Sequence, residues 1–215
     1  MPSGEPRYDA ILFDFDGVLV ESEPVHFACW REVLAPFGIT LDWETYQRRC
    51  IGIADRAMLE TLCALSEPPL DIDRLWEQYP RKKTLFRERM LKSEIVRPEV
   101  RDLLESLDEY RMALVTSSGR SEVEPLLKAA GIRQYFAAVV CGDDVARRKP
   151  APDPYLKAAQ LLGAARPLVV EDSTAGIESG KAAGFEVLAV TSSAAMPSAL
   201  RRHLDARAEP PFTSL

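Results

Sequence analysis

Short apolar runs alternate with amphipathic segments through the second half of the chain. The runs have the length and the β-branched content of strands buried on both faces, and they cover residues 111–117, 137–141, 167–171 and 186–191. A similar run, residues 10–15, lies near the start. The segments between the runs have apolar residues at helical spacing. This order predicts an α/β fold with a doubly wound parallel sheet, a Rossmann-like core.

Polar and glycine residues predict where these helices begin and end. Ser121 and Glu124 have the spacing of a capping box. Asp153 is placed as an N-cap, followed by a proline at the first helical position. Glycines that follow the last periodic residue predict the helix ends, and they are Gly131, Gly163 and Gly184.

The region after the first apolar run has a different pattern. Residues 21–93 contain successive segments with apolar spacings near 3.6 and no convincing strand. We therefore expect an all-helical cap domain, residues 21–93, inserted after strand one. The α/β core domain is predicted to consist of residues 1–20 and 94–215.

Composition narrows the class of protein. The 215 residues include 47% hydrophobic and 28% charged residues, as in ordinary globular proteins. A net charge of −6 argues against a nucleic-acid partner. No run reaches membrane-spanning length, and residues 1–9 lack the apolar core of a signal peptide. Four scattered cysteines without C-x-x-C spacing indicate free thiols. We expect a cytoplasmic protein without a membrane partner, and a monomer.

Two carboxylates interrupt the first apolar run, "ILFDFDGVLVESE". A buried aspartate is costly unless it is paired or bound to a metal. Asp14 and Asp16 are two apart, so on an extended chain they point to one side, and Gly17 lets the chain turn away. Glu171 and Asp172 follow a later strand and can approach from the other side. Oxygen ligands alone predict Mg²⁺ as the cofactor.

Other strand ends supply groups that fit a phosphate ester. Asp14 is the candidate nucleophile, and Asp16 the candidate acid and base. Thr116 and Lys149 are candidates to hold the phosphoryl oxygens. The backbone of Ser117 is a further candidate contact. The sequence therefore predicts an enzyme acting on a small-molecule phosphate ester.

Four motifs in this order resemble the haloacid dehalogenase-like superfamily: "DFDGVLVESE", "LVTSS", "KPAPDPY" and "VVEDSTAG". The similarity covers almost the whole chain and is closest to the branch of phosphatases and beta-phosphoglucomutases with a helical cap. The resemblance implies that Asp14 attacks phosphorus and that Asp16 exchanges the proton. It also implies that Mg²⁺ is held by Asp14, the Asp16 carbonyl and Asp172, with Glu171 a near or direct ligand. Because Asp16 is present, phosphate esters are expected rather than halides or phosphonates.

Within the cap the resemblance is weaker. His26 and Trp30 match positions in the beta-phosphoglucomutase branch, where such a histidine works with a cap lysine. Lys82 is the candidate lysine here, with Lys83 equally compatible by register. The substrate loop corresponds to "RCIGIADR" around Gly52, where relatives that bind a sugar bisphosphate place basic residues. The apolar and acidic residues found here favour a phosphatase.

Two alternatives stay open at this point. A phosphosugar mutase of the beta-phosphoglucomutase type would use the same core residues and a second phosphate site. A non-enzymatic phospho-acceptor signalling domain or a calcium-type metal-binding domain also places acids around a cation. In the signalling domain, however, the acceptor follows a middle strand and no cap is inserted. In a calcium loop, the glycine comes two places later than Gly17.

Overall fold

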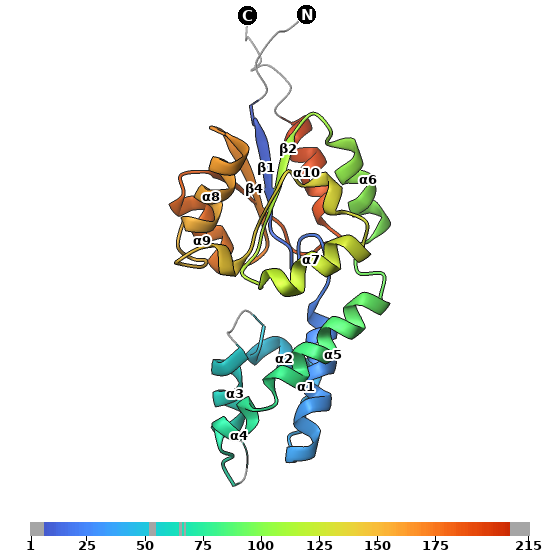
Figure 1. Cartoon of the computed structure of the whole chain (residues 1–215), viewed down its shortest axis with the longest axis vertical. Helices are drawn as coiled ribbons and strands as arrows, with labels where there is room; N and C mark the ends of the chain where they lie inside the picture. Colours follow the sequence, from blue (N-terminus) through green and yellow to red (C-terminus); the bar gives the residue numbers. More distant parts are fainter. Residues whose placement is uncertain (1–6, 52–54, 65, 67, 207–215) are drawn as a thin grey trace, which may run out of the picture. The chain divides into compact units, whose positions relative to one another are not determined.

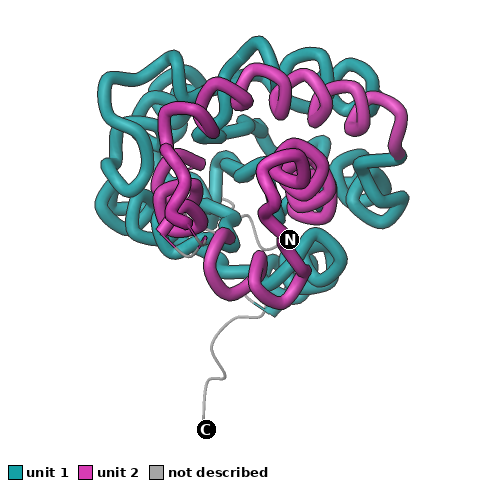
Figure 2. The backbone as a smooth tube through the Cα atoms, turned by 90° about the horizontal axis from the view of Figure 1, so that it is seen from below, with its two compact units in different colours: residues 1–21, 94–215 teal, residues 22–93 magenta. Residues whose placement is uncertain are grey.

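The computed structural model describes residues 7–51, 55–64, 66 and 68–206. The chain forms two compact units, shown in different colours in Figure 2. One consists of residues 1–21 and 94–215, and the other of residues 22–93.

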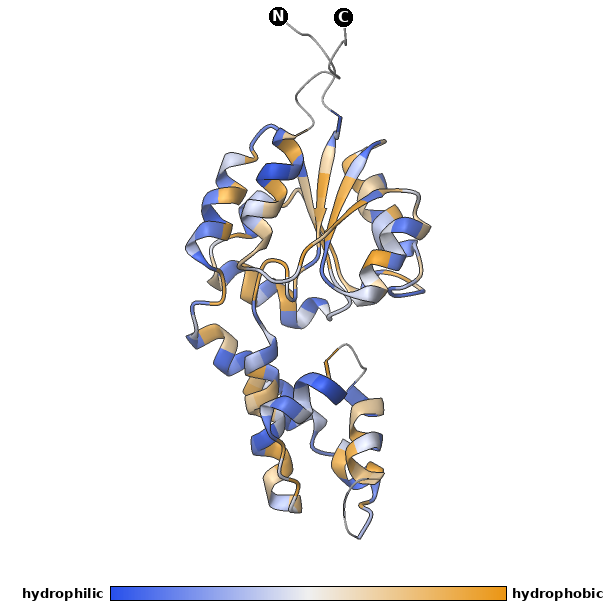
Figure 3. Cartoon of the chain, turned by 180° about the vertical axis from the view of Figure 1, so that it is seen from behind, coloured by the Kyte–Doolittle hydropathy of each residue, from blue (hydrophilic) through white to orange (hydrophobic). Residues whose placement is uncertain are grey.

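The first unit is built on a five-stranded parallel sheet in the order β3-β2-β1-β4-β5. The strands are β1 (Ala10–Phe13), β2 (Arg111–Val115), β3 (Ala138–Val140), β4 (Pro167–Glu171) and β5 (Glu186–Ala189). Strand β1 is central because it pairs with both β2 and β4. Four of the five strands are almost wholly buried, which agrees with the apolar residues that make up most of each strand (Figure 3).

Helices cover both faces of this sheet: in Figure 1, α8 and α9 lie on one side, and α6 and α10 on the other. The helices are α6 (Pro98–Ser106), α7 (Arg120–Ala129), α8 (Asp153–Leu162), α9 (Thr174–Ala182) and α10 (Met196–Asp205). Short 3₁₀ turns, η2 (Arg133–Tyr135) and η3 (Gly142–Asp144), flank β3. Helix α8 packs on the sheet through Tyr155, Ala158 and Leu162. The predicted doubly wound α/β core is confirmed.

The predicted helix starts were less accurate than the predicted ends. Helix α7 begins at Arg120, so the expected capping box at Ser121 is wrong. Its first N–H is instead accepted by Oδ2 of Asp143, 3.0 Å away on a different loop. Helix α8 begins one residue early, with Asp153 inside it and Pro152 as the N-cap. The three stop glycines all have positive φ, between 62° and 80°, which only glycine adopts readily.

The second unit is helical throughout its described part, as expected for the inserted cap. Its elements are α1 (Glu23–Leu34), the 3₁₀ turn η1 (Ala35–Phe37), α2 (Trp43–Arg49), α3 (Asp55–Ala64), α4 (Ile72–Trp76) and α5 (Tyr79–Lys92). Its own core contains Trp30, Leu34, Tyr46, Leu59 and Leu75, each at most 4% exposed. Within the described part of the chain, every helix is too short or too polar to cross a membrane.

Candidate active site

The register of the sheet brings three polar strand ends to one edge. Phe13, the last residue of β1, pairs with Leu114 of β2 and Val170 of β4. The next residue, Asp14, donates its backbone N–H to the Val170 carbonyl at 3.0 Å. Carboxyl ends of parallel strands form the usual ligand site of such sheets. The sheet itself therefore sets Asp14 beside the end of β4.

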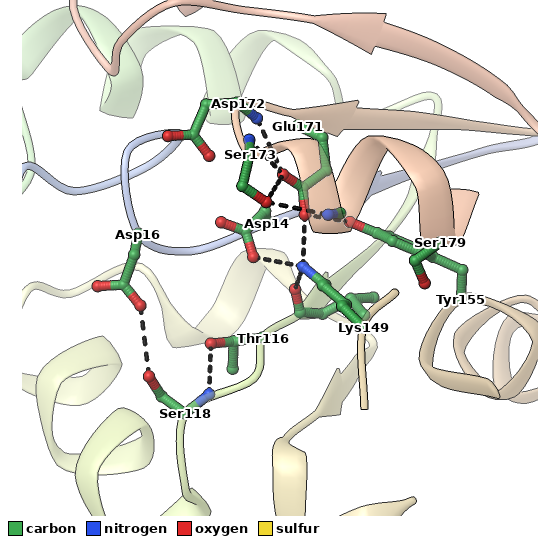
Figure 4. Close-up of polar contacts among 12 residues, drawn as sticks. Asp14, Asp16, Thr116, Ser118, Lys149, Tyr155, Glu171, Asp172, Ser173 and Ser179 are labelled. Carbon is green, nitrogen blue, oxygen red and sulfur yellow. Dashed lines mark hydrogen bonds and ion pairs between the residues drawn. The ribbon is translucent and has the colours of Figure 1, made fainter. Parts of the chain in front are cut away.

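Lys149 is at the centre of this site (Figure 4). Its ammonium donates to Oδ1 of Asp14 at 2.5 Å, to Oε1 of Glu171 at 2.6 Å and to the Val115 carbonyl at 2.9 Å. The side chain is only 5% exposed. Burial by itself lowers the pKa of Lys149, but the charges of Asp14 and Glu171 outweigh it and raise that pKa above 10.5. Lys149 is thus a permanent cation against the candidate nucleophile.

Glu171 is fully buried, and donors surround both of its oxygens. Oε1 accepts hydrogen bonds from Lys149 and, at 2.9 Å, from the Tyr155 hydroxyl. Oε2 accepts from the backbone N–H groups of Asp172 and Ser173 and from the Ser173 hydroxyl, at 2.9 to 3.0 Å. Such partners are what a buried carboxylate needs. Glu171 is therefore held in one position and engaged with the lysine.

Three carboxylates converge here. Oxygens of Asp14, Glu171 and Asp172 all lie within 4.8 Å of one another. Burial raises the pKa of Asp14 well above its usual range, and the charges of Glu171 and Asp16 add to this against the opposing charge of Lys149. Burial and the Glu171 charge raise the pKa of Asp172 to about 6. One lysine does not neutralise this group, so the donor set fits a hard divalent cation.

Gly17 makes the turn that closes the site. Its φ is +78°. A Cβ on this residue would lie 2.0 Å from Oδ2 of Asp172, so a side chain here and the present position of Asp172 exclude each other. The predicted turn at Gly17 is present, and its second role is to let the two loops approach.

The second aspartate has a separate position. Oδ2 of Asp16 lies 3.4 Å from the Ser118 hydroxyl, which donates to it (Figure 4). Its side chain is not one of the three clustered carboxylates. The contribution of the Asp16 carbonyl to a metal site stays a prediction.

The loop after β2 carries the candidate phosphate contacts. Thr116 is 2% exposed, and its hydroxyl oxygen accepts the Ser118 N–H at 3.0 Å. Ser117 is exposed. The loop is close-packed, because a Cβ on Gly142 would lie 2.3 Å from the Ser117 carbonyl. A phosphate contact from Ser117 stays a prediction.

The sequence did not indicate several residues that build this site. Tyr155 reads as an ordinary core aromatic, because nothing in a helical pattern shows which buried tyrosine finds a carboxylate. Gly176 reads as a residue of a helix, yet a Cβ there would lie 1.6 Å from Oε1 of Glu171. Ser179 is fully buried and donates to the Ala151 carbonyl at 2.6 Å, which holds the loop after Lys149.

The cap unit has a polar cluster of its own. Lys82 is 3% exposed, and its ammonium lies 2.8 Å from Nδ1 of His26 and 3.4 Å from Oδ2 of Asp55. The Trp30 indole N–H donates to the other Asp55 oxygen at 3.1 Å. Burial and the Lys82 charge lower the pKa of His26 well below 6.5, so the neutral ring accepts a hydrogen bond from the Lys82 ammonium at Nδ1.

Two other cap predictions have different outcomes. The Lys83 ammonium lies 5.7 Å from the centre of the Tyr79 ring, so it is Lys82 rather than Lys83 that contacts the histidine. Gly52 lies outside the described residues.

Comparisons with known proteins agree with this site. Residues 11–190 match the family model for haloacid dehalogenase-like hydrolases, so the chain belongs to that family. It is 34% identical over 187 residues to the fructose-1-phosphate phosphatase YqaB of Escherichia coli (strain K12), covering 86% of this chain and 97% of YqaB. It is 33% identical over 183 residues to a phosphorylated carbohydrates phosphatase of Thermotoga maritima, covering 83% of this chain and 82% of that protein.

A solved structure supports the same assignment of the fold. The crystal structure of a predicted phosphoglycolate phosphatase from Haemophilus somnus 129pt matches with a TM-score of 0.76 and 26% identity over 88% of each chain. The expected family and the enzyme class, a haloacid dehalogenase-like phosphatase, are confirmed. The non-enzymatic alternatives are thereby set aside.

Proposed function

We propose that this protein is a Mg²⁺-dependent phosphatase that hydrolyses a small phosphomonoester, such as a sugar phosphate, through an aspartyl-phosphate. The observation that carries the proposal is the contact of the buried Lys149 ammonium with Asp14 at 2.5 Å. Among the described residues, nothing donates a hydrogen bond to the other Asp14 oxygen, Oδ2. A buried carboxylate with one oxygen free and a fixed cation beside it suits attack on an anionic phosphate.

The other side chains have roles that follow from their positions. Lys149 would neutralise the charge on the phosphoryl oxygens while Asp14 attacks phosphorus. The Thr116 hydroxyl and the Ser117 backbone would orient those oxygens. Asp16 would give a proton to the leaving oxygen and later take one from the water that hydrolyses the aspartyl ester. The ester oxygen leaves as an alcohol, and the enzyme releases inorganic phosphate.

The carboxylate group accounts for the proposed metal dependence. Asp14 and Asp172 would hold the cation with the Asp16 carbonyl, and Glu171 would lie next to it as a near or direct ligand. When bound, Mg²⁺ would neutralise these carboxylates and polarise a phosphoryl oxygen. Burial, with the charges of neighbouring carboxylates added to it, raises the pKa values of Asp14 and Asp172, which supports a cation as their partner.

The charge of the polar cluster in the cap distinguishes a phosphatase from the mutase alternative. A mutase must hold a second phosphate, which calls for surplus cations in the cap. Here the Lys82 ammonium faces the Asp55 carboxylate and a neutral His26, so this cluster has no net positive charge. The names of the two relatives, a fructose-1-phosphate phosphatase and a phosphorylated carbohydrates phosphatase, also favour hydrolysis. The His26–Lys82 contact is the feature that keeps the mutase reading as second candidate.

The proposal also covers the cellular compartment and the oligomeric state. All four cysteines are buried free thiols, which suits a reducing compartment such as the cytoplasm. We propose that it works there as a monomer, without nucleic acid or membrane.

A panel of phosphomonoesters tests the proposal, including fructose 1-phosphate and both anomers of hexose 1-phosphates, with Mg²⁺ present. Release of inorganic phosphate is expected. An isomerised sugar phosphate without phosphate release would establish the mutase instead.

Asp14→Asn is expected to reduce turnover below a hundredth of wild type while the circular dichroism spectrum stays unchanged. A more active Asp14→Asn variant would contradict the role of Asp14.

A further inference from the structure

Tyr155 and Lys149 share one acceptor. The Tyr155 hydroxyl donates to Oε1 of Glu171 at 2.9 Å, and the Lys149 ammonium donates to the same oxygen at 2.6 Å. We propose that Tyr155 is a positioning residue for phosphoryl transfer: its hydroxyl shares Oε1 of Glu171 with Lys149, which limits the pull of Glu171 on the ammonium and leaves that ammonium against Asp14. This inference rests on the proposed function of the site.

The hydroxyl is not needed to fill the core. Tyr155 is fully buried on α8, where its ring packs among apolar side chains of the sheet. A phenylalanine would fill the same space without a polar atom to satisfy, because a buried hydroxyl costs free energy unless it is hydrogen-bonded. A tyrosine at this position therefore points to the bond with Glu171. The ring also faces the lysine, whose Nζ lies 5.0 Å from the ring centre.

Glu171 has little freedom to compensate if that bond is lost. Oε2 is held by two backbone N–H groups and the Ser173 hydroxyl. On the side of α9, Gly176 approaches so closely that a Cβ would lie 1.9 Å from the Glu171 Cδ. The carboxylate thus stays where it is, and only the partners of Oε1 can change.

Removal of the Tyr155 hydroxyl would alter how strongly Glu171 and Asp14 each attract the Lys149 ammonium. Oε1 would then have only Lys149 as a donor, so Glu171 would attract the ammonium more strongly. Lys149 would be drawn away from Asp14 and from the phosphoryl oxygens on which charge develops. An interaction that strengthens toward the transition state affects kcat more than KM. We expect Tyr155→Phe to lower kcat by about tenfold and to change KM by less than twofold.

The experiment compares Tyr155→Phe with Tyr135→Phe in the hydrolysis of 4-nitrophenyl phosphate with saturating Mg²⁺. Tyr135 is the matched control, since its hydroxyl also donates to a glutamate, Glu105 at 2.7 Å, on the surface. Both variants are repeated in the Glu171→Gln background. If Tyr155 acts through Glu171, Tyr155→Phe has no further effect there.

Each outcome decides the inference. An unchanged kcat in Tyr155→Phe, or an equal loss in Tyr135→Phe, overturns it. A full tenfold loss that persists in the Glu171→Gln background overturns it as well, because Tyr155 would then act by another route. If wild type hydrolyses no ester at all, the proposed function fails and urea unfolding decides the inference. Non-additive changes in unfolding midpoint for Tyr155→Phe and Lys149→Met support it, and additive changes overturn it.

Discussion

Gly17 and Asp172 approach so closely that a side chain at position 17 would displace the Asp172 carboxylate. A Cβ on Gly17 would lie 2.0 Å from Oδ2 of Asp172 and 2.7 Å from its Cγ. The loop after β1 can therefore pack this closely against the loop after β4 only without a side chain at position 17. The group that it approaches is one of the three carboxylates of the candidate metal site. A side chain at position 17 would have two effects, displacement of Asp172 and backbone strain from the positive φ. Experiments can separate them.

The substitution Gly17→Ala is expected to displace Asp172 and to lower activity at least tenfold. It also pays for a positive φ, which costs about 1–2 kcal/mol for a residue with a side chain. Gly184→Ala is the matched control, since Gly184 has φ +80° and nothing within 4 Å of its Cβ position. In urea unfolding, backbone strain should lower the free energy of unfolding of the control by a similar amount. Its kcat/KM should stay unchanged. Equal activity losses in the two variants would contradict the role of the Gly17–Asp172 contact.

The buried cation at Lys149 allows a prediction about stability. Lys149→Met removes the positive charge beside Asp14 and Glu171, so Glu171 remains buried without its charged partner. Removal of one partner of a buried ion pair costs about 3–5 kcal/mol. Urea unfolding should show a loss of this size together with loss of turnover. Lys128→Met, at an exposed position on α7, should change neither.

A double variant separates the two effects of that lysine. Lys149→Met combined with Glu171→Gln removes both charges, so part of the lost stability should return. Activity should not return, because the phosphoryl group would still have no ammonium. A double variant as unstable as Lys149→Met alone would show that the missing charge partner is not the cause.

Metal binding should appear as thermal stabilisation without any substrate. A ligand at a hundred times its dissociation constant stabilises the folded state by about 2.7 kcal/mol, which corresponds to several degrees in Tm for a chain of this size. We expect Mg²⁺ to raise Tm in wild type and Asp172→Asn to lose most of this shift. Glu178→Gln, an exposed residue of α9, is the control and should keep it. A full shift in Asp172→Asn would exclude that carboxylate from the metal site.

The strands and the acidic strand ends could be predicted because their causes are local. Strands buried on both faces are apolar along most of their length, so the four runs after residue 110 and the run at β1 were visible in the sequence. The topology of such a sheet then directs attention to Asp14, Thr116 and Glu171, which follow or end strands. The stop glycines were equally visible, since a positive φ is a property of a single residue.

Features that depend on contacts between distant segments could not be predicted. The first N–H of α7 finds its acceptor in Asp143, more than twenty residues further along the chain, so the expected capping box at Ser121 was wrong. Tyr155 and Gly176 have roles only because the sheet brings α8 and α9 to the same carboxylate. In the cap, Lys82 of α5 is neutralised by Asp55 of α3. The sequence pattern of neither helix indicates this contact.

Asp144 provides a prediction about pH. Burial raises the pKa of this carboxyl, but the Cys141 N–H, at 2.7 Å from Oδ2, and the Arg120 guanidinium, at 2.6 Å, outweigh burial and hold the pKa below 3.8. A group whose pKa is lower in the folded state binds protons less readily there than in the unfolded chain. Its stabilising effect is therefore complete above pH 3.8 and is lost as the pH falls through the lower, folded value.

Asp144→Asn should therefore lower the free energy of unfolding by about 1 kcal/mol near pH 7, the usual scale for a partly exposed hydrogen-bonded group. The difference from wild type should shrink as the pH falls below 4, because the wild-type carboxyl is then neutral as well. Urea unfolding at a series of pH values measures this, with Asp108→Asn at an exposed position as the control. A difference that stays constant down to pH 3 would mean that the charge of Asp144 is not what stabilises the loop before α8.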